Sequence, residues 1–210
     1  MKLRLVLVPT VSLSLLVFSA VSTRSQTVVT FDDIDLTLPN YATNMPNGYQ
    51  GLTWSNLWVN NEILRLNEGY SHDGYYYGMV SPSNDVYNAN GTPAEIDSAT
   101  NFNFLSVYLT GTWTSNLNIQ VEGFNGVQEI YNTIVVASAT NPTLFTFNYL
   151  DINRLYFDSY GGEPAFDGND ATEFVMDNFI VEFVPEPSAD VLVIGGMLIL
   201  TGFSLMRKNT

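Results

Sequence analysis

Apolar and polar residues alternate strictly, up to the glycine, along Leu117-Asn118-Ile119-Gln120-Val121-Glu122-Gly123-Phe124. A two-residue period of this kind is typical of a β-strand with one buried face. Asn125-Gly126 follows, and residues 127–136 then have the pattern of a second strand. An Asn-Gly pair between two such runs is the strongest local signal for a hairpin. The stretch therefore predicts an antiparallel hairpin.

Similar runs precede and follow this hairpin. Between the two ends of the chain, no segment has convincing helical periodicity. The other expected strands are 27–31, 52–59, 77–81, 102–110, 143–149, 153–158 and 174–183. About nine strands rich in aromatic and β-branched residues bury their inner faces only by stacking as two sheets. We therefore expect one all-β domain over residues 26–184, a two-sheet antiparallel β-sandwich with jelly-roll-like connections.

The beginning of the chain predicts export. Lys2 and Arg4 precede an apolar run at 5–18, and small residues follow up to Ser22. This layout is that of a secretory signal peptide. Residues 1–22 are therefore expected to direct the chain through the Sec translocon.

The other end predicts a membrane anchor. Residues 191–206 form a run of 16 without a charge, closed by Arg207 and Lys208. Such a run predicts a short transmembrane helix, and basic flanking residues stay on the cytoplasmic side. The acidic domain would then lie outside the inner membrane, in agreement with the signal peptide. The alternative, a helix buried in a protein core, does not account for the basic residues at the terminus.

A Pro-Glu-Pro sequence stands before this apolar run, at Pro185, Glu186 and Pro187. Together with the glycine-containing run and the terminal Arg207 and Lys208, it resembles the PEP-CTERM sorting signal of exported proteins of Gram-negative bacteria. By structural reasoning alone, the two prolines would simply form a stiff, extended linker.

The resemblance covers residues 185–208 and implies a substrate of an exosortase-type membrane protease. The protein would be anchored in the inner membrane before processing and would then lie at the cell surface or outside the cell, among secreted exopolysaccharide. The central domain is more loosely similar to β-sandwich domains that accompany this signal, through stretches such as Thr30-Phe31-Asp32-Asp33 and Met176-Asp177-Asn178-Phe179.

Charge and residue content exclude several classes of function. Residues 26–184 contain 19 acidic residues and only two basic ones, Arg65 and Arg154. Such a surface repels phosphate backbones, so no nucleic-acid partner is expected. The chain has no cysteine and a single histidine, His72. This excludes disulfides, thiolate nucleophiles and zinc sites rich in Cys or His.

Three aspartates are candidate ligands of a metal ion. If residues alternate along the last strand, Asp177 points to the same side as large apolar residues. In the first strand, Asp33 would likewise point to the same side as Val29 and Phe31. The first and last strands of a jelly roll tend to be neighbours, so these carboxylates could converge, with Asp32 contributing. Because no basic side chain is at hand, structural Ca²⁺, which prefers oxygen ligands, is the expected partner. The alternative is an Asx turn at Asp33 and backbone N–H donors to Asp177.

A tyrosine-rich segment is the candidate ligand-binding loop. Tyr70, Tyr75, Tyr76 and Tyr77 lie among glycines near His72. A tyrosine ring stacks on the apolar face of a sugar while its hydroxyl forms hydrogen bonds, so these tyrosines are candidates for carbohydrate binding. The alternative is that some rings pack under a loop and the rest face solvent.

These features predict a non-catalytic, exported surface or matrix protein that is structural or binds carbohydrate, with exopolysaccharide as the expected partner. No nucleophile motif accompanies His72. The main alternative is an extracellular glycan hydrolase that uses an unidentified pair of carboxylates. A passive matrix protein without a specific ligand is a third hypothesis.

Overall fold

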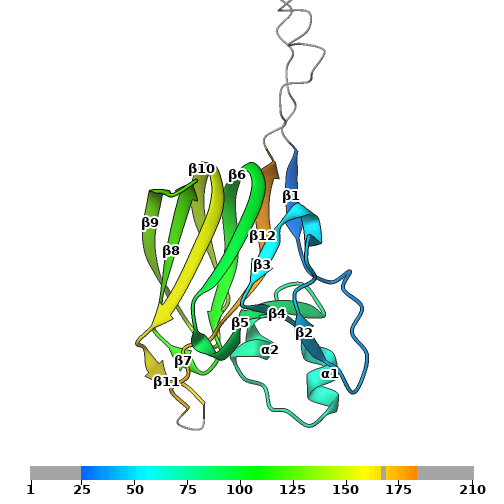
Figure 1. Ribbon diagram of the computed structural model, residues 1–210. Helices are drawn as coiled ribbons and strands as arrows, with labels where there is room; N and C mark the ends of the chain where they lie inside the picture. Colours follow the sequence, from blue (N-terminus) through cyan, green and yellow to red (C-terminus); the bar gives the residue numbers. More distant parts are fainter. Residues whose placement is uncertain (1–24, 167–168, 184–210) are drawn as a thin grey trace, which may run out of the picture. The chain divides into compact units, whose positions relative to one another are not determined.

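The computed structural model describes residues 25–166 and 169–183, which form a mainly antiparallel β-domain (Figure 1). Its strands are β1 (Gln26–Val29), β2 (Ala42–Asn44), β3 (Thr53–Ser55), β4 (Leu57–Asn61), β5 (Asn84–Asn88), β6 (Ala94–Gly111), β7 (Thr114–Ser115), β8 (Leu117–Asn125), β9 (Gln128–Ala137), β10 (Thr143–Tyr160), β11 (Glu163–Pro164) and β12 (Phe174–Phe183). The short helices are α1 (Glu62–Asn67), α2 (Gly74–Gly78), η1 (Tyr49–Gly51) and η2 (Ala89–Gly91). The prediction of an all-β domain is confirmed.

The predicted signal peptide, residues 1–22, and the predicted sorting signal, residues 185–208, lie outside the described residues. Within the part of the chain that is described, no helix is long and apolar enough to cross a membrane.

One large sheet contains most of the strands, in the order β2-β4-β5-β12-β6-β10-β8-β9. In addition, β1 pairs with β12 and β3 pairs with β6, while β7 and β11 form a separate two-stranded sheet. The first and last strands are therefore neighbours, as expected.

Two long strands carry the large sheet from one layer of the domain to the other. β6 and β10 have 18 residues each and pair with one another, with register shifts between Thr146 and Arg154 of β10. The beginning of β6 also pairs with β3 and its end with β12, whereas the second half of β10 pairs with β8. A single hydrogen-bonded sheet thus supplies both layers, where two separate sheets were expected.

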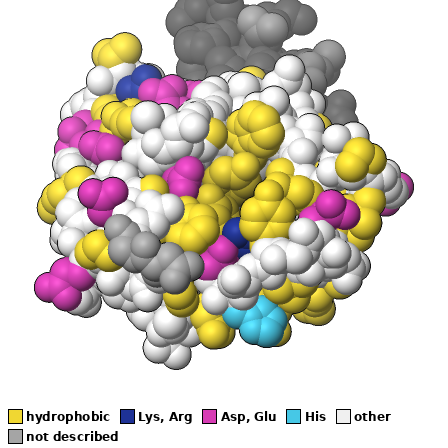
Figure 2. Space-filling view, turned by 90° about the horizontal axis from the view of Figure 1, so that it is seen from below, with side chains coloured by type: hydrophobic (Ala, Val, Ile, Leu, Met, Phe, Trp, Pro, Cys, Tyr) yellow, Lys and Arg dark blue, Asp and Glu magenta, His cyan; other side chains and the backbone are white. Residues whose placement is uncertain are grey.

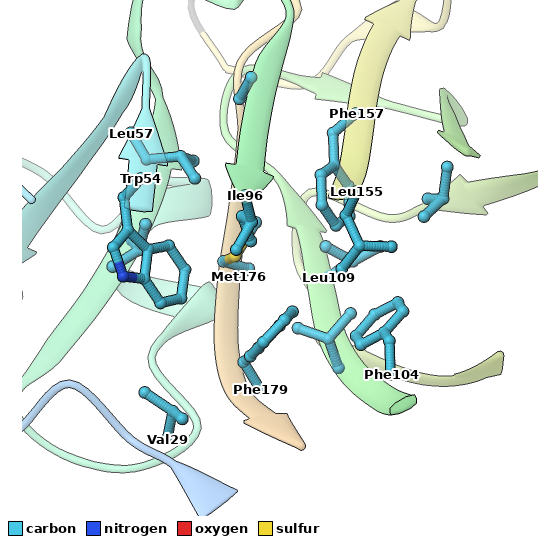
Figure 3. Close-up of a cluster of buried hydrophobic side chains, with 14 of the residues drawn as sticks. Val29, Trp54, Leu57, Ile96, Phe104, Leu109, Leu155, Phe157, Met176 and Phe179 are labelled. Carbon is cyan, nitrogen blue, oxygen red and sulfur yellow. The ribbon is translucent and has the colours of Figure 1, made fainter. Parts of the chain in front are cut away.

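The inner faces of the two layers enclose one hydrophobic core (Figure 3). Trp54 of β3 and Phe157 of β10 belong to one layer, and Phe174 and Phe179 of β12 belong to the other. The ring centroids are 5.7 Å apart in both the Trp54–Phe179 and the Phe157–Phe174 pair. All four side chains are buried, so these contacts hold the two layers face to face.

The predicted hairpin is confirmed as β8 and β9. Side chains along β8 alternate between buried and half-buried from Leu117 to Phe124. Asn125 pairs with Gln128 across the turn, where Gly126 has a φ of +60°. Glycine adopts this left-handed conformation without the steric penalty of a Cβ atom, which explains the Asn-Gly signal.

Several predicted strand boundaries are wrong. The run 52–59 is divided into β3 and β4 at Asn56, which has a φ of +55° and whose side-chain amide donates to the carbonyl of Pro93 at 2.9 Å. The runs 143–149 and 153–158 form one strand, β10, because its register shifts bend the strand without ending it. These irregularities depend on partners that are distant in the sequence, so local patterns do not reveal them.

The prediction of a strand at 77–81 is also wrong, since helix α2 extends through residue 78 and the next strand, β5, begins only at Asn84. The Asp73 side chain accepts the backbone N–H of Tyr75 at 3.1 Å and so caps the N-terminus of the helix. α1 begins in the same way, because the Asn61 side chain accepts the N–H of Leu64 at 2.9 Å.

Residues 62–83, which contain both helices, cover the outer face of β5 and β12. Val86 of β5 is buried in the core, so strand alternation places Asp85 and Tyr87 on the opposite, outer face. α2 packs closely on this face, because a Cβ atom at Gly78 would lie 2.6 Å from a side chain of β12. The outer face is therefore a second, covered region of the domain, and it contains the candidate site.

Candidate functional site

A hollow lined by aromatic side chains, called here the tyrosine pocket, lies where α1 and α2 meet the outer face. Its volume is about 200 Å³, and it is lined by Tyr41, Asn60, Arg65, Tyr70, Tyr75, Tyr87 and Trp113. A second hollow of about 430 Å³ shares Tyr70 and Trp113 with it and is also lined by Gly69, Ser71, His72, Asp73 and Phe166. Figure 2 shows this end of the domain, where yellow side chains surround dark-blue and magenta ones.

Ring contacts and hydrogen bonds fix the aromatic residues of the tyrosine pocket. The Tyr75 ring meets the Tyr87 and Trp113 rings edge to face, at centroid distances of 5.1 and 5.9 Å. The Tyr75 hydroxyl and the Trp113 indole N–H both donate to Oε2 of Glu173, at 3.1 and 3.0 Å. Burial, with Glu173 adding to it, raises the pKa of Tyr75, so the hydroxyl keeps its proton and remains a donor.

Arg65 ties the two helices to the aromatic rings. Its guanidinium donates two hydrogen bonds to the Asp73 carboxylate, at 2.9 and 2.5 Å, and one to Glu62 at 3.2 Å. The same group lies 4.6 Å from the ring centroid of Tyr70 and 4.7 Å from that of Tyr75. Two carboxylates and two π faces therefore hold this cation, and the rings are ordered before any ligand binds.

The structure places two of the four predicted carbohydrate-binding tyrosines in the lining. Tyr70 and Tyr75 line the tyrosine pocket. Tyr76 instead stacks on His72, with ring centroids 4.1 Å apart, and Tyr77 lies parallel to Phe166. This division follows from α2, because successive residues of a helix point in different directions.

Sequence reasoning missed three aromatic residues of the pocket, namely Tyr41, Tyr87 and Trp113. Each lies in a segment separate from the tyrosine-rich loop, and none belongs to a local motif. The Tyr41 hydroxyl donates to the Tyr70 hydroxyl at 2.7 Å, a contact between residues 29 positions apart. Only the pairing of the strands brings these side chains together.

The three predicted calcium ligands are not brought together. Among residues 25–166 and 169–183, no group of three or more His, Asp or Glu side chains is placed to hold a metal ion. β1 ends at Val29 and Phe31 has a φ of +65°, so the chain leaves the strand before Asp32 and Asp33. Asp32 instead accepts the Asn84 backbone N–H at 2.9 Å, and Asp33 accepts the Tyr49 hydroxyl at 2.5 Å.

Asp177 is buried, but not on the side that strand alternation predicted. The register shift after Asp177 puts Phe179 in the core and Asp177 on the outer face, where N–H donors surround its carboxylate. Oδ2 accepts the backbone N–H groups of Val80 and Ser81, both at 2.7 Å, and Oδ1 accepts that of Asn178 at 2.6 Å. Burial raises the pKa of Asp177 to about 7, and these donors oppose the rise. A cation at this carboxylate would meet N–H protons, so the structure supports the alternative of backbone donors at an irregular point of β12.

No protein-family model matches the chain, and no curated protein matches it. Three solved structures show limited similarity. A DUF4465 family protein from Bacteroides ovatus has 10% identity and a TM-score of 0.48, covering 77% of this chain and 100% of that one. The K1 cleaved adhesin domain of Lys-gingipain from Porphyromonas gingivalis has 9% identity and a TM-score of 0.40, covering 78% and 99%. TmCBM61, solved with β-1,4-galactotriose, has 9% identity and a TM-score of 0.28, covering 66% and 89%. Similarities this low identify no function.

Proposed function

We propose that this protein is an exported carbohydrate-binding module that associates with exopolysaccharide at the cell surface through its tyrosine pocket. The pocket is the observation that carries the proposal. Arg65 and Glu173 hold its rings in place without a ligand. A site that is already ordered loses less conformational entropy when it binds.

The chemistry of the two hollows suits a neutral sugar. Tyrosine and tryptophan rings stack on the apolar face of a pyranose, while polar neighbours such as Ser71 bind hydroxyl groups. Asp73 lines the larger hollow, and Glu68 lines a further hollow beside Tyr70. These carboxylates disfavour an acidic glycan through charge repulsion, so a neutral polysaccharide is the expected ligand.

A glycan hydrolase is the rival function, and it needs two carboxyl groups that are free to react. Asp73, which lines the larger hollow, instead accepts two hydrogen bonds from Arg65. Glu173 accepts hydrogen bonds from Tyr75 and Trp113. Carboxylates held in this way position arginine and aromatic side chains, which favours binding over catalysis.

Export and sorting belong to the same proposal. The signal-peptide pattern at residues 1–22 and the Pro-Glu-Pro, apolar and Arg-Lys pattern at 185–208 support secretion followed by processing by an exosortase-type protease. The protein would thereby reach the surface on which secreted polysaccharide accumulates.

Affinity electrophoresis of the full chain, purified in detergent, through gels that contain neutral or acidic polysaccharides tests the binding. We expect retardation by a neutral polysaccharide, and a loss of affinity of about tenfold or more in Tyr70→Ala and Trp113→Ala. Tyr160→Ala is the matched control, because Tyr160 is 42% exposed against 45% for Tyr70 and lines none of the three hollows described. Failure to bind any neutral polysaccharide contradicts the proposal, and release of shortened glycan favours the hydrolase.

A further inference from the structure

Asp85 is a fully buried carboxylate on the outer face of β5. Its exposed fraction is 0%, and neither of its oxygen atoms has a hydrogen-bond partner among the described residues. Removal of an unpaired carboxylate from water is among the most unfavourable changes in folding. Such a group therefore requires a proton or a cation.

A second unpaired oxygen lies directly across the sheet. Asn60 of β4 pairs with Asp85 in the antiparallel register, which places both side chains on the same face. Asn60 is 2% exposed, and its Oδ1 atom likewise has no hydrogen-bond partner within the described part of the chain. Its amide nitrogen donates to Oε1 of Glu62. Three oxygen atoms without hydrogen-bond partners, two of Asp85 and one of Asn60, thus lie on the same face of paired residues of β4 and β5.

The other charged groups on this face already have partners. Arg65 donates to Asp73 and to Oε2 of Glu62. Asp177 accepts three backbone N–H groups. Of the four acidic side chains buried on this face, Asp85 is the one without a donor in the described structure. Burial, with Glu62 and Asp177 adding to it, raises the pKa of Asp85 well above its ordinary range.

We propose that Asp85 and Oδ1 of Asn60 bind a hard divalent cation such as Ca²⁺ behind the tyrosine pocket. Carboxylate and amide oxygens are the ligands that Ca²⁺ prefers, and backbone carbonyls or water complete its six to eight positions. The site uses one carboxylate and an amide, so it differs from a cluster of three acidic side chains and from the Asp32, Asp33 and Asp177 set. Asn60 also lines the tyrosine pocket, so a bound cation would stabilise the pocket by fixing the Asn60 side chain.

Thermal unfolding of the full chain, stripped with chelator and then titrated with Ca²⁺ alone, tests the site. At a concentration 100-fold above Kd we expect Tm to rise by about 5–10 °C. Asp85→Asn should abolish the rise, because it removes the charge at nearly constant volume. Asp35→Asn, the same substitution at an exposed aspartate, should keep it.

Terbium luminescence provides a second measurement for the case that Asp85→Asn does not fold. Tb³⁺ occupies Ca²⁺ sites, and excitation of Tyr75 and Tyr87 nearby should produce emission that Ca²⁺ displaces from the wild-type chain. Asn60→Leu should weaken this displacement by about tenfold or more without altering charge. The proposal is overturned if Ca²⁺ leaves the wild-type Tm and the terbium emission unchanged, or if Asp85→Asn folds and responds to Ca²⁺ as the wild type does.

Discussion

Four carboxylates, those of Glu62, Asp73, Asp85 and Asp177, are buried where the segment that contains α1 and α2 packs on the outer face. Arg65 is the one buried basic side chain among the described residues. They have three kinds of environment: ion pairs with Arg65 at Glu62 and Asp73, backbone donors at Asp177, and no donor among the described residues at Asp85. Burial raises the pKa of Glu62, Asp85 and Asp177, so the protonation of these three differs between the folded and unfolded states and the stability of the domain depends on pH.

In calcium-free buffer, we expect the free energy of unfolding to fall as pH rises from about 4.5 to about 7. Burial raises the pKa of Glu62 from its usual 4.5 to about 7, against the opposing effect of Arg65, so the folded chain keeps a proton that the unfolded chain has released. This contribution to stability is complete below the unfolded pKa and is lost as pH rises through the folded one. Asp177, with a pKa of about 7, acts in the same direction. Urea denaturation across this pH range measures the effect.

Two glutamine substitutions separate this effect from the general acidity of the domain. Glu62→Gln should reduce the loss of stability over the interval by about 2 kcal/mol, because the group that titrates is gone. Glu68→Gln, the same change at an exposed residue after α1, should leave the pH profile as it is. Stability that rises between these pH values in the wild type would contradict the expectation.

Helix α2 shows how close packing overrides local preference. Its tyrosines favour a strand, and residues 77–81 were predicted to form one. The Asp73 cap starts a helical turn, and Gly74 allows that turn to approach the backbone of β6. A Cβ atom at Gly74 would lie 2.0 Å from the carbonyl oxygen of Gly111. The position of α2, and with it that of Tyr75 in the tyrosine pocket, depends on this approach.

Gly74→Ala should therefore lower the free energy of unfolding by about 3 kcal/mol or more, because the added methyl group meets backbone atoms that have little room to move. Gly126→Ala is the matched control. Gly126 has a φ of +60° and nothing within 4 Å of an added Cβ, so only its conformational penalty of about 1 kcal/mol is expected. The shift of the urea midpoint relative to wild type, measured for both variants, tests this expectation. Equal shifts would show that α2 tolerates displacement from β6.

The chain as a whole combines a cation-poor domain with basic residues at its two ends. Of seven Lys and Arg residues, only Arg65 and Arg154 lie between residues 26 and 184. Arg65 is buried among carboxylates, and the guanidinium of Arg154 lies 4.2 Å from the ring centroid of Phe124. Within the described part of the chain, neither forms part of a basic patch.

Replacement of Pro185, Glu186 and Pro187 by alanine together should block processing in the native host. We expect full-length chain to accumulate in the inner membrane, whereas the wild type appears at the cell surface or in the medium with a lower mass. Cell fractionation with immunoblotting measures both. Pro142→Ala, a proline change in an exposed loop of the domain, should not alter sorting. Wild-type chain that stays uncut and soluble in the cytoplasm would refute the proposed route.

The alternation from Leu117 to Phe124 and the Asn-Gly turn were sufficient to predict the hairpin, because they reflect forces between near neighbours. Strand alternation placed Asp177 on the side of Phe179, but the register shift after Asp177 puts it on the outer face, where residues 62–83 bury it. Alternation says nothing about which donors a buried group meets, so it did not reveal that backbone N–H groups surround the Asp177 carboxylate. The bends in β6 and β10 depend on partners in other strands and have no local signature.

Residue order alone was enough for the β class of the domain, its main hairpin and its acidic character, since each follows from composition or from contacts a few residues apart. Strand pairing decided the rest. It joined Tyr41 and Trp113 to the tyrosine-rich loop and set Asn60 opposite Asp85. Contacts between residues this far apart in the sequence form only when the whole sheet has folded around its core, because the position of each segment depends on the packing of the strands between them.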